Sequence, residues 1–271
     1  MSETSDDDGI EQLPPTYRFE RSHLRNCTKQ RFLLIRSFSK CLRLAMDEPP
    51  LDIRGWRNPY LNKEEPEVLE ENLPTRDPHK LFDVWFKKIA EIKSTTFEEL
   101  NTCCFSTVGK DMRPSSRIVL LKAYSAEGFS FFTNYNSRKG KQLEENPYAC
   151  MLFYWANRHR QIRIEGKVEK LSQEAAVEYW NSRPLSSRIG SKSSEQSTVI
   201  PSRQFLIDKR KALQELAEKE GEAAITKPES WGGYILIPDY FEFWQGQSDR
   251  VHDRLEFRKT GDKWVMQRLS P

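Results

Sequence analysis

Near the C-terminal end of the chain, three basic or potentially basic side chains occur at alternate positions. They are Arg250, His252 and Arg254. If residues 250–258 form a strand, these side chains share one face, because alternate residues of a strand point the same way. Like charges on one face repel one another, so the spacing predicts a bound anion such as a phosphorylated ligand. An exposed face neutralised by neighbouring acidic residues explains the same spacing, and both interpretations stay open at this point.

A second set of polar residues surrounds the end of the helix predicted at 172–183. Tyr179 and Arg183 are four residues apart and are therefore neighbours on that helix. Pro184 ends the helix, and Ser187 lies in the turn that follows. A phenol, a guanidinium and a hydroxyl beside a helix N-terminus could hold a phosphate group. A capped helix end at the surface is the alternative.

A third cluster begins the helix predicted at 137–146. Arg138, Lys139 and Lys141 lie in its first turns, where positive charge opposes the helix dipole. An anion bound at the same end would remove this conflict. A solvated cluster, balanced by acidic residues later in the helix, is the alternative.

Several amide and indole side chains suit a planar ring with hydrogen-bond donors and acceptors. With one hydroxyl, they are Gln161, Gln196, Ser197, Trp244 and Gln247. The sequence shows neither a hydrolase triad nor a metal-ligand spacing. Anion sites without acid–base pairs are typical of a protein that orients a cofactor, which then supplies the chemistry.

The composition is that of a globular protein with little net charge. The chain has 271 residues, and its 43 basic and 40 acidic side chains give a formal net charge of +3. Nucleic-acid binding is not expected from this balance, and we expect no membrane span. Five cysteines without a disulfide or zinc spacing indicate a reducing compartment. We expect a cytoplasmic protein, although the acid-free basic segment 21–46 also resembles a mitochondrial targeting sequence.

Three zones are expected along the chain: a loosely attached basic extension at 1–50, an N-terminal arm at 51–76 and a folded domain at 77–271. The domain is expected to open with a helix that has Asp77 as its N-cap and Pro78 at its first position. One apolar stripe of this helix consists of Leu81, Phe82, Trp85 and Ile89. Further expected helices lie at 137–146, 172–183 and 202–220. The expected strands of the domain lie at 101–108, 115–124, 129–135, 148–156, 160–170, 232–237, 240–247, 250–258 and 263–268. Short antiparallel strands with helices between them predict a mainly β (α+β) fold, in which a β-barrel or rolled sheet carries peripheral helices.

Several long stretches of the domain are similar to the pyridoxamine/pyridoxine 5'-phosphate oxidase family. They are SSRIVLLK (115–122), FFTNYNSRKGKQL (131–143), FYWANRHRQIRIEG (153–166), YWNSRPLSSRIG (179–190), EQSTVIP (195–201), SWGGYILIP (230–238) and FWQGQSDRVHDR (243–254). They follow one another in order over 77–271. The resemblance implies a split β-barrel that binds flavin mononucleotide (FMN). It also implies a homodimer with FMN at the subunit interface.

The resemblance further implies which residues bind each ligand. For FMN these are Arg117, Ile118, Val119, Leu120, Phe132, Thr133, Arg138, Lys139, Gln161, Gln196, Ser197, Trp244 and Arg254. For the phosphorylated substrate they are Lys122, Tyr179, Arg183, Ser187, Arg250, Val251 and His252. Arg250 and His252 are the expected catalytic residues. Arg57 and Tyr60 resemble an R-x-x-Y element that closes over the substrate in some relatives.

One pair of these residues constrains the fold. Arg117 and Lys122 are five positions apart, so a flat strand would point them to opposite faces. If both reach the same site, the strand expected at 115–124 must bend, or Lys122 must reach from its end.

The reaction implied by the resemblance is the oxidation of pyridoxamine or pyridoxine 5'-phosphate to pyridoxal 5'-phosphate. A hydride would pass from the C4' carbon of the substrate to N5 of the flavin, and dioxygen would then reoxidise the flavin to give hydrogen peroxide. With pyridoxamine 5'-phosphate, hydrolysis of the resulting imine would release ammonia. One alternative is a non-catalytic protein of the same fold that binds pyridoxal phosphate or flavin. Another is a flavin enzyme of this barrel class that acts on a different substrate.

Overall fold

The computed structural model describes residues 68–91 and 99–271, and its strands form one antiparallel sheet. The sheet runs in the order β2-β1-β5-β6-β7-β4-β3, and β8 and β9 extend it from β7. The strands are β1 Thr102–Val108, β2 Pro114–Leu120, β3 Ala123–Tyr124, β4 Phe129–Asn134, β5 Tyr148–Trp155, β6 Arg160–Lys170, β7 Trp231–Gln245, β8 Asp253–Thr260 and β9 Lys263–Arg268. The expected mainly β fold with antiparallel strands and peripheral helices is confirmed.

Helix α2 (Pro78–Ala90) covers the apolar side of the sheet. It begins as the sequence predicts, because the Asp77 side chain accepts hydrogen bonds from the backbone N–H groups of His79 and Lys80. Its apolar stripe enters the main core with side chains from β1, β4, β5, β6, β7 and β8. The stripe consists of Leu81, Phe82, Trp85 and Ile89.

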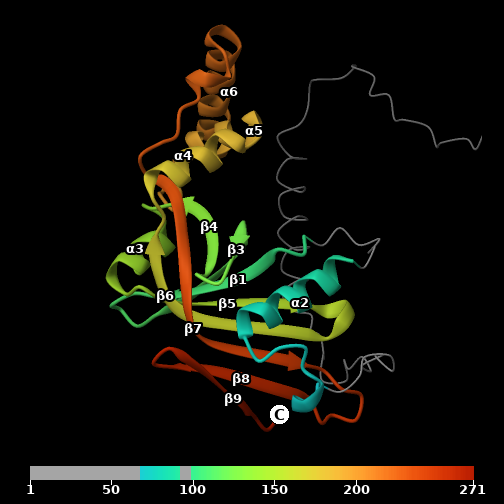
Figure 1. Ribbon diagram of the computed structural model, residues 1–271. Helices are drawn as coiled ribbons and strands as arrows, with labels where there is room; N and C mark the ends of the chain where they lie inside the picture. Colours follow the sequence, from blue (N-terminus) through green and yellow to red (C-terminus); the bar gives the residue numbers. More distant parts are fainter. Residues whose placement is uncertain (1–67, 92–98) are drawn as a thin grey trace, which may run out of the picture. The chain divides into compact units, whose positions relative to one another are not determined.

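Three further helices gather near the Trp231 end of β7, away from β8 and β9 (Figure 1). They are α4 (Gln173–Ser182), α5 (Leu185–Ser193) and α6 (Arg203–Glu220). They enclose a second, smaller core, which consists of Trp180, Ile189, Ala217, Ile225 and Trp231. The short helices are η1 Glu70–Asn72, η2 Ala156–Arg158 and η3 Glu222–Ala224, and α3 spans Arg138–Glu145. Helix α5 was not expected as a separate helix.

The strand expected at 115–124 is broken after Leu120. Strand β2 pairs with β1, whereas β3 pairs with β4, so the chain changes partners at Leu121 and Lys122. The N–H of Lys122 donates to the carbonyl oxygen of Ser130 at 2.8 Å, which begins the new pairing. The bend that Arg117 and Lys122 required is therefore present.

The two strands expected at 232–237 and 240–247 are a single strand, β7. Pro238 lies inside it without ending it, because the partner strand β6 shifts register between Glu165 and Gly166. At this bulge a Cβ on Gly166 would lie 2.1 Å from the carbonyl oxygen of Ile237, so only glycine fits. One continuous strand thus pairs with β6 through residues 234–245, with β4 through residues 231–236 and with β8 through residues 240–245.

The strand expected at 250–258 begins only at Asp253. Arg250 has φ +72°, a left-handed conformation that does not occur in a regular strand. The prediction that Arg250, His252 and Arg254 share one strand face was therefore wrong, because the first two lie in the loop before β8. The alternation of residue types at 250–254 is typical of a strand, but the chain makes a turn at Arg250.

Some predictions fall outside the described residues. The extension at 1–50 and most of the arm at 51–76, including Arg57 and Tyr60, are among them. Of the helices in the described part of the chain, none has the length and apolar character needed to cross a membrane.

His79 should make the stability of the fold depend on pH. Its ring contacts those of Phe129, Phe241 and Trp264, with centroids 6.1, 5.2 and 5.9 Å away. Burial lowers the pKa of His79 below 6.5. The unfolded chain then binds the proton more readily, so the free energy of unfolding should fall as the pH drops below 6.5.

The test compares urea unfolding of the wild type and His79→Phe at about pH 7.5 and about pH 5.5. The variant keeps an aromatic ring but cannot titrate, so it should lose less stability than the wild type between the two pH values. Equal losses in the two proteins would contradict this role for His79.

Candidate functional site

A cavity of about 770 Å³ is lined by β2, β4 and the α4–α5 region, and it collects most of the predicted site residues. Those that line it are Arg117, Ile118, Val119, Leu120, Lys122, Phe132, Thr133, Lys139, Tyr179, Arg183, Ser187 and Gln196. The cations among them are Arg117, Lys122, Lys139 and Arg183, and none of the described residues that line the cavity is acidic. The cavity therefore carries positive charge that its own walls do not neutralise.

Lys139 is the most buried of these cations, with 7% of the residue exposed. Its Nζ donates to Thr133 Oγ1 at 2.9 Å, to Gln196 Oε1 at 2.9 Å and to Ser137 Oγ at 3.3 Å. All three acceptors are neutral. Burial, with a smaller contribution from the charge of Arg117, lowers the pKa of Lys139 to about 8. An anion in the cavity would be a negatively charged partner for Lys139, whose present acceptors are all neutral.

The start of α3 is built to place Lys139 in the cavity wall. The Ser137 side chain caps the helix by accepting a hydrogen bond from the N–H of Gly140. Gly140 packs directly on the preceding turn, where a Cβ would lie 1.9 Å from the carbonyl oxygen of Tyr135. Glycine at this position thus lets the basic first turn of α3 approach β4.

Arg117 reaches the cavity from β2. Its guanidinium donates to the carbonyl oxygen of Phe105 at 3.0 Å, to Thr107 Oγ1 at 2.8 Å and to Ser115 Oγ. Burial lowers the pKa of Arg117, and the nearby charge of Arg138 lowers it further. Like Lys139, Arg117 is held by neutral groups while its charge stays uncompensated.

Arg183 forms a second cationic position in the same cavity. Its guanidinium carbon lies 4.9 Å from the centre of the Trp231 ring and 5.4 Å from that of Trp180. Tyr179 stacks on Phe132 with 4.0 Å between ring centroids, which completes an aromatic wall. The Nη1 atom of Arg183 is buried and has no hydrogen-bond partner in the described structure. A buried donor of this kind is costly to leave unpaired, so its position favours an anionic ligand.

The structure adds residues that sequence reasoning missed. They are Asn134, Pro184, Gly190, Ser191, Ser194 and Trp231. A signal for three of them was present, because Ser187, Gly190, Ser191 and Ser194 recur at the spacing of one helix face. A stripe of small polar residues is easily missed, because helices are usually recognised by an apolar stripe.

Two predicted residues lie beside the cavity. Arg138 and Ser197 line a neighbouring pocket of about 560 Å³. Ser197 Oγ accepts a hydrogen bond from the backbone N–H of Arg138 at 3.2 Å. Ser197 also has φ +72°, and a left-handed conformation in a non-glycine residue often marks a functional position.

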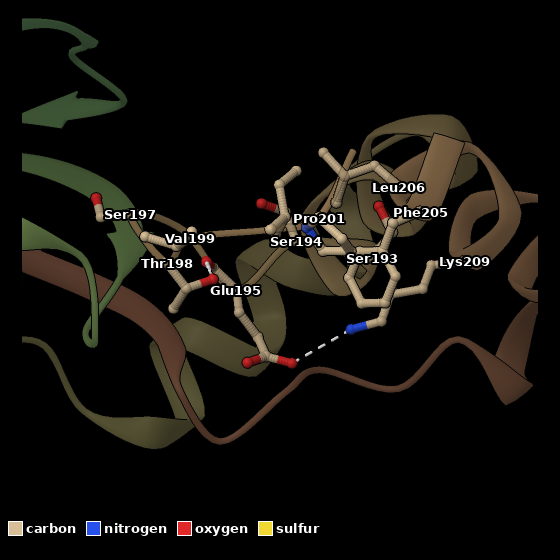
Figure 2. Close-up of a pocket in the computed structure, with 11 residues that line it drawn as sticks. Ser193, Ser194, Glu195, Ser197, Thr198, Val199, Pro201, Phe205, Leu206 and Lys209 are labelled. Carbon is tan, nitrogen blue, oxygen red and sulfur yellow. Dashed lines mark hydrogen bonds and ion pairs between the residues drawn. The ribbon is translucent and has the colours of Figure 1, made fainter. Parts of the chain in front are cut away.

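The loop that carries Gln196 and Ser197 has a second pocket on its α6 side. This pocket of about 290 Å³ is lined by Val199, Phe205 and Leu206 (Figure 2). Glu195 and Lys209 also line it and form an ion pair, with 3.3 Å between Oε1 and Nζ. Its acidic and basic side chains are paired with each other. It lacks the uncompensated charge of the large cavity, so we place the site in the large cavity.

The remaining predicted residues in the described part of the chain lie around the start of β8, and we call them the C-terminal cluster. They are Gln161, Trp244, Arg250, Val251, His252 and Arg254. Gln161, Trp244 and Arg254 are cross-strand neighbours on β6, β7 and β8. The His252 ring lies 5.1 Å from that of Trp244. Trp244 is near one end of β7, and the cavity residue Trp231 is at the other. The length of β7 therefore separates the C-terminal cluster from the cavity within one subunit.

Comparison with solved structures defines the class of fold. PhzG from Burkholderia lata, solved in complex with tetrahydrophenazine-1-carboxylic acid, matches with a TM-score of 0.70 at 28% identity, over 76% of this chain and 98% of its own. A pyridoxamine 5'-phosphate oxidase-related, FMN-binding protein from Nostoc punctiforme shares the fold at a TM-score of 0.52 and 16% identity, over 65% and 90%. The expected split β-barrel is confirmed.

Comparison of the sequence narrows this class. Residues 90–216 match the family model for pyridoxamine 5'-phosphate oxidase, and residues 231–271 match the model for the pyridoxine 5'-phosphate oxidase C-terminal dimerisation region. Pyridoxine-5'-phosphate oxidase of Bos taurus is 44% identical over 86% of this chain and 93% of its own. A Caenorhabditis elegans relative whose name assigns it to the same family is 63% identical, over 83% and 100%. The chain belongs to the pyridoxamine 5'-phosphate oxidase family.

The charge of Lys139 should control the affinity for a phosphorylated ligand such as FMN. Lys139→Met should weaken binding by about 1.5–3 kcal/mol, the usual range for a hydrogen bond to a charged group. Because the pKa of Lys139 is about 8 in the described structure, wild-type affinity should fall as the pH rises through that value. The variant should lack this pH dependence.

Flavin fluorescence titration of the apoprotein between about pH 7 and about pH 9 measures both effects. Lys141→Met is the matched control, because Lys141 is exposed on the same helix. A control that loses as much affinity as Lys139→Met would show that general surface charge, rather than Lys139, attracts the ligand.

Proposed function

We propose that the protein is an FMN-dependent oxidase that converts pyridoxamine and pyridoxine 5'-phosphate to pyridoxal 5'-phosphate. One observation carries this proposal: a single cavity holds two cationic positions, each without an acidic partner. Arg117 and Lys139 form the first, and Arg183 forms the second. A phosphorylated cofactor beside a phosphorylated substrate requires two such positions.

The residues present fit FMN at the first position. Lys139 and Arg117 direct uncompensated charge into the cavity, while Thr133 and Gln196 add neutral hydrogen-bonding groups. When bound, FMN would accept a hydride from the C4' carbon of the substrate and pass the electrons to dioxygen, with hydrogen peroxide as the product. We assign the following residues to FMN: Arg117, Ile118, Val119, Leu120, Phe132, Thr133, Arg138, Lys139, Gln161, Gln196, Ser197, Trp244 and Arg254.

We assign the second position to the substrate phosphate. The cation–π contacts hold the Arg183 guanidinium in place, and the Ser187 hydroxyl group lies in the first turn of α5, where an anion is favoured. Tyr179 and Lys122 complete this assignment. Holding the phosphate at one end orients the rest of a small substrate, which lowers the entropic cost of reaching a reactive geometry.

We assign Arg250, Val251 and His252 to the pyridine end of the substrate. Arg250, like Ser197, holds a left-handed conformation, and such strain is typical of functional loops. A guanidinium there would stabilise negative charge on the ring, and the imidazole would contact the substrate. Arg57 and Tyr60 stay a prediction for closing the site.

We further propose that the enzyme is a homodimer whose sites combine the cavity of one subunit with the C-terminal cluster of the other. Two observations support this arrangement. The family's dimerisation region covers β7, β8 and β9. Large apolar side chains are also exposed on the sheet face that carries the cluster, with Tyr148 57% and Tyr154 56% accessible. A second copy of the chain would cover them.

The most direct test is the absorption spectrum of the purified protein, followed by its reaction with pyridoxamine 5'-phosphate. We expect bound flavin and release of hydrogen peroxide. A protein that is colourless after loading with FMN, or a flavin-loaded protein that releases no peroxide, would refute the proposed oxidase.

The two cationic positions should separate in mutants. Arg183→Ala should raise the KM for pyridoxine 5'-phosphate and leave bound FMN nearly unchanged, with a loss of ~10- to 100-fold in kcat/KM. Arg254→Ala should first empty the flavin site. Flavin absorbance per protomer and kinetics with excess FMN distinguish the two outcomes. Arg258→Ala, an exposed position on the same strand as Arg254, should change neither.

Shared sites should allow two defective subunits to complement each other. Arg183→Ala and Arg254→Ala proteins, unfolded together and refolded, should regain activity, because a mixed dimer contains one site with both arginines intact. Random pairing makes about half of the dimers mixed, so activity should approach about one quarter of wild type. Activity no higher than the mean of the two parents would place each site within one subunit.

A further inference from the structure

Asp253, the first residue of β8, is a buried carboxylate that receives three hydrogen bonds. The residue is 6% exposed. Its Oδ1 accepts from Arg268 Nη1 at 2.8 Å, and its Oδ2 accepts from the N–H of Val68 at 3.1 Å and from Gln247 Nε2 at 2.7 Å. A carboxylate with both oxygens engaged cannot rotate without breaking a bond. Asp253 is therefore a fixed point at the base of the loop that precedes β8.

Arg268 reinforces this fixed point from β9. Its Nε and Nη2 donate to the two carboxylate oxygens of Glu70 at 2.7 and 2.8 Å, and Nη2 also donates to the carbonyl oxygen of Val68 at 2.6 Å. Two parallel hydrogen bonds of this kind hold the guanidinium of Arg268 in the plane of the Glu70 carboxylate. The Asp253 carboxylate is thus braced against both β9 and residues 68–70.

Gln247 connects Asp253 to both predicted catalytic residues. Its side chain donates to Asp253, its backbone N–H donates to His252 Nδ1 at 3.0 Å, and its carbonyl oxygen accepts from the N–H of Arg250 at 3.2 Å. Because Nδ1 of His252 is the acceptor, a neutral imidazole carries its proton on Nε2. The bond from the Gln247 backbone thus favours the Nε2–H tautomer of His252 and, together with the Trp244 ring, orients the imidazole.

The loop needs such support, because it lacks the regular hydrogen bonds of a strand between Gln245 and Asp253. It also contains the left-handed Arg250, a conformation that persists only when the surroundings hold it. The N–H of Gly246 donates to the carbonyl oxygen of His159 at 2.8 Å, which fixes the start of the loop. The Gln247–Asp253 hydrogen bond closes its end.

We propose that Gln247 and Asp253 are positioning residues, which hold the imidazole of His252 in the orientation that the oxidation requires. The proposal rests on the role assigned to His252 under the proposed function. Gln247 acts through His252 rather than on the substrate, since its side chain is already engaged by Asp253.

The test uses Gln247→Leu in the FMN-loaded enzyme. Leucine has a similar size and keeps the backbone N–H, but it cannot donate to Asp253. We expect kcat for pyridoxine 5'-phosphate to fall by about 10-fold, because small displacements of a catalytic group are costly. Flavin per protomer, thermal midpoint and KM should stay near wild type, whereas a general structural defect would change flavin content and thermal midpoint as well. Such changes together with the fall in kcat would overturn the proposal.

Gln204→Leu is the matched control. Gln204 Nε2 on α6 donates to Asp208 Oδ1 at 2.8 Å, so the same substitution removes the same type of bond away from the loop. It should leave kcat unchanged. An equal fall in kcat in both variants would overturn the proposal.

A double-mutant cycle with His252→Ala separates the proposal from the proposed function. In the His252→Ala background, Gln247→Leu should cause no further fall in kcat. A full 10-fold fall in that background would show that Gln247 does not act through His252. Normal kinetics of His252→Ala alone would refute the role of His252, whereas an impaired His252→Ala beside a normal Gln247→Leu would refute only the positioning.

Discussion

Positive charge buried without a negative partner is the constraint on which the site depends. Arg117 and Lys139 are desolvated and bonded to neutral oxygen atoms, and Arg183 keeps a buried donor unpaired. Removing charge from water, almost fully at Lys139 and in part at Arg117 and Arg183, costs free energy that a bound anion offsets. The protein is therefore less stable with this cavity empty than with phosphorylated ligands inside it, and ligand binding adds to folding stability.

A cavity of this kind needs supports that do not neutralise it. The Ser137 cap and the close packing of Gly140 hold the first turn of α3 against β4. Trp180 and Trp231 hold the Arg183 guanidinium through their ring faces, which attract a cation without forming an ion pair. Neutral supports fix the cations in position and leave their charge for the ligand. An aspartate in the same place would fix them equally well and weaken binding.

Strong periodicity made parts of this structure predictable from the sequence. The stripe of Leu81, Phe82, Trp85 and Ile89 identified α2, because nothing but a buried helix face explains that spacing. The spacing of Arg117 and Lys122 indicated a bend in the next strand, but not its position after Leu120, since that position depends on which strand pairs with each side.

Within the site, residue types and resemblance identified the members of both clusters but not their geometry. The unpaired donor of Arg183 depends on surrounding rings, and the turn at Arg250 depends on a backbone angle that arginine rarely adopts. Helix α5 escaped notice because its functional face consists of serine and glycine, which resemble a loop. The geometry of the site therefore depends on contacts between segments that are distant in the sequence, which local sequence patterns do not show.

The central position of β7 has a consequence for how the chain folds during synthesis. Strands β4, β6 and β8 all pair with β7, and Phe129 in β4 finds its partner only at Leu236. Until residues 231–245 leave the ribosome, β4 and β6 expose unpaired backbone groups along one edge each. Pairing across such long sequence separations is slow, and open edges favour aggregation while it proceeds. Nascent chains should thus depend most on chaperones during the interval before β7 emerges.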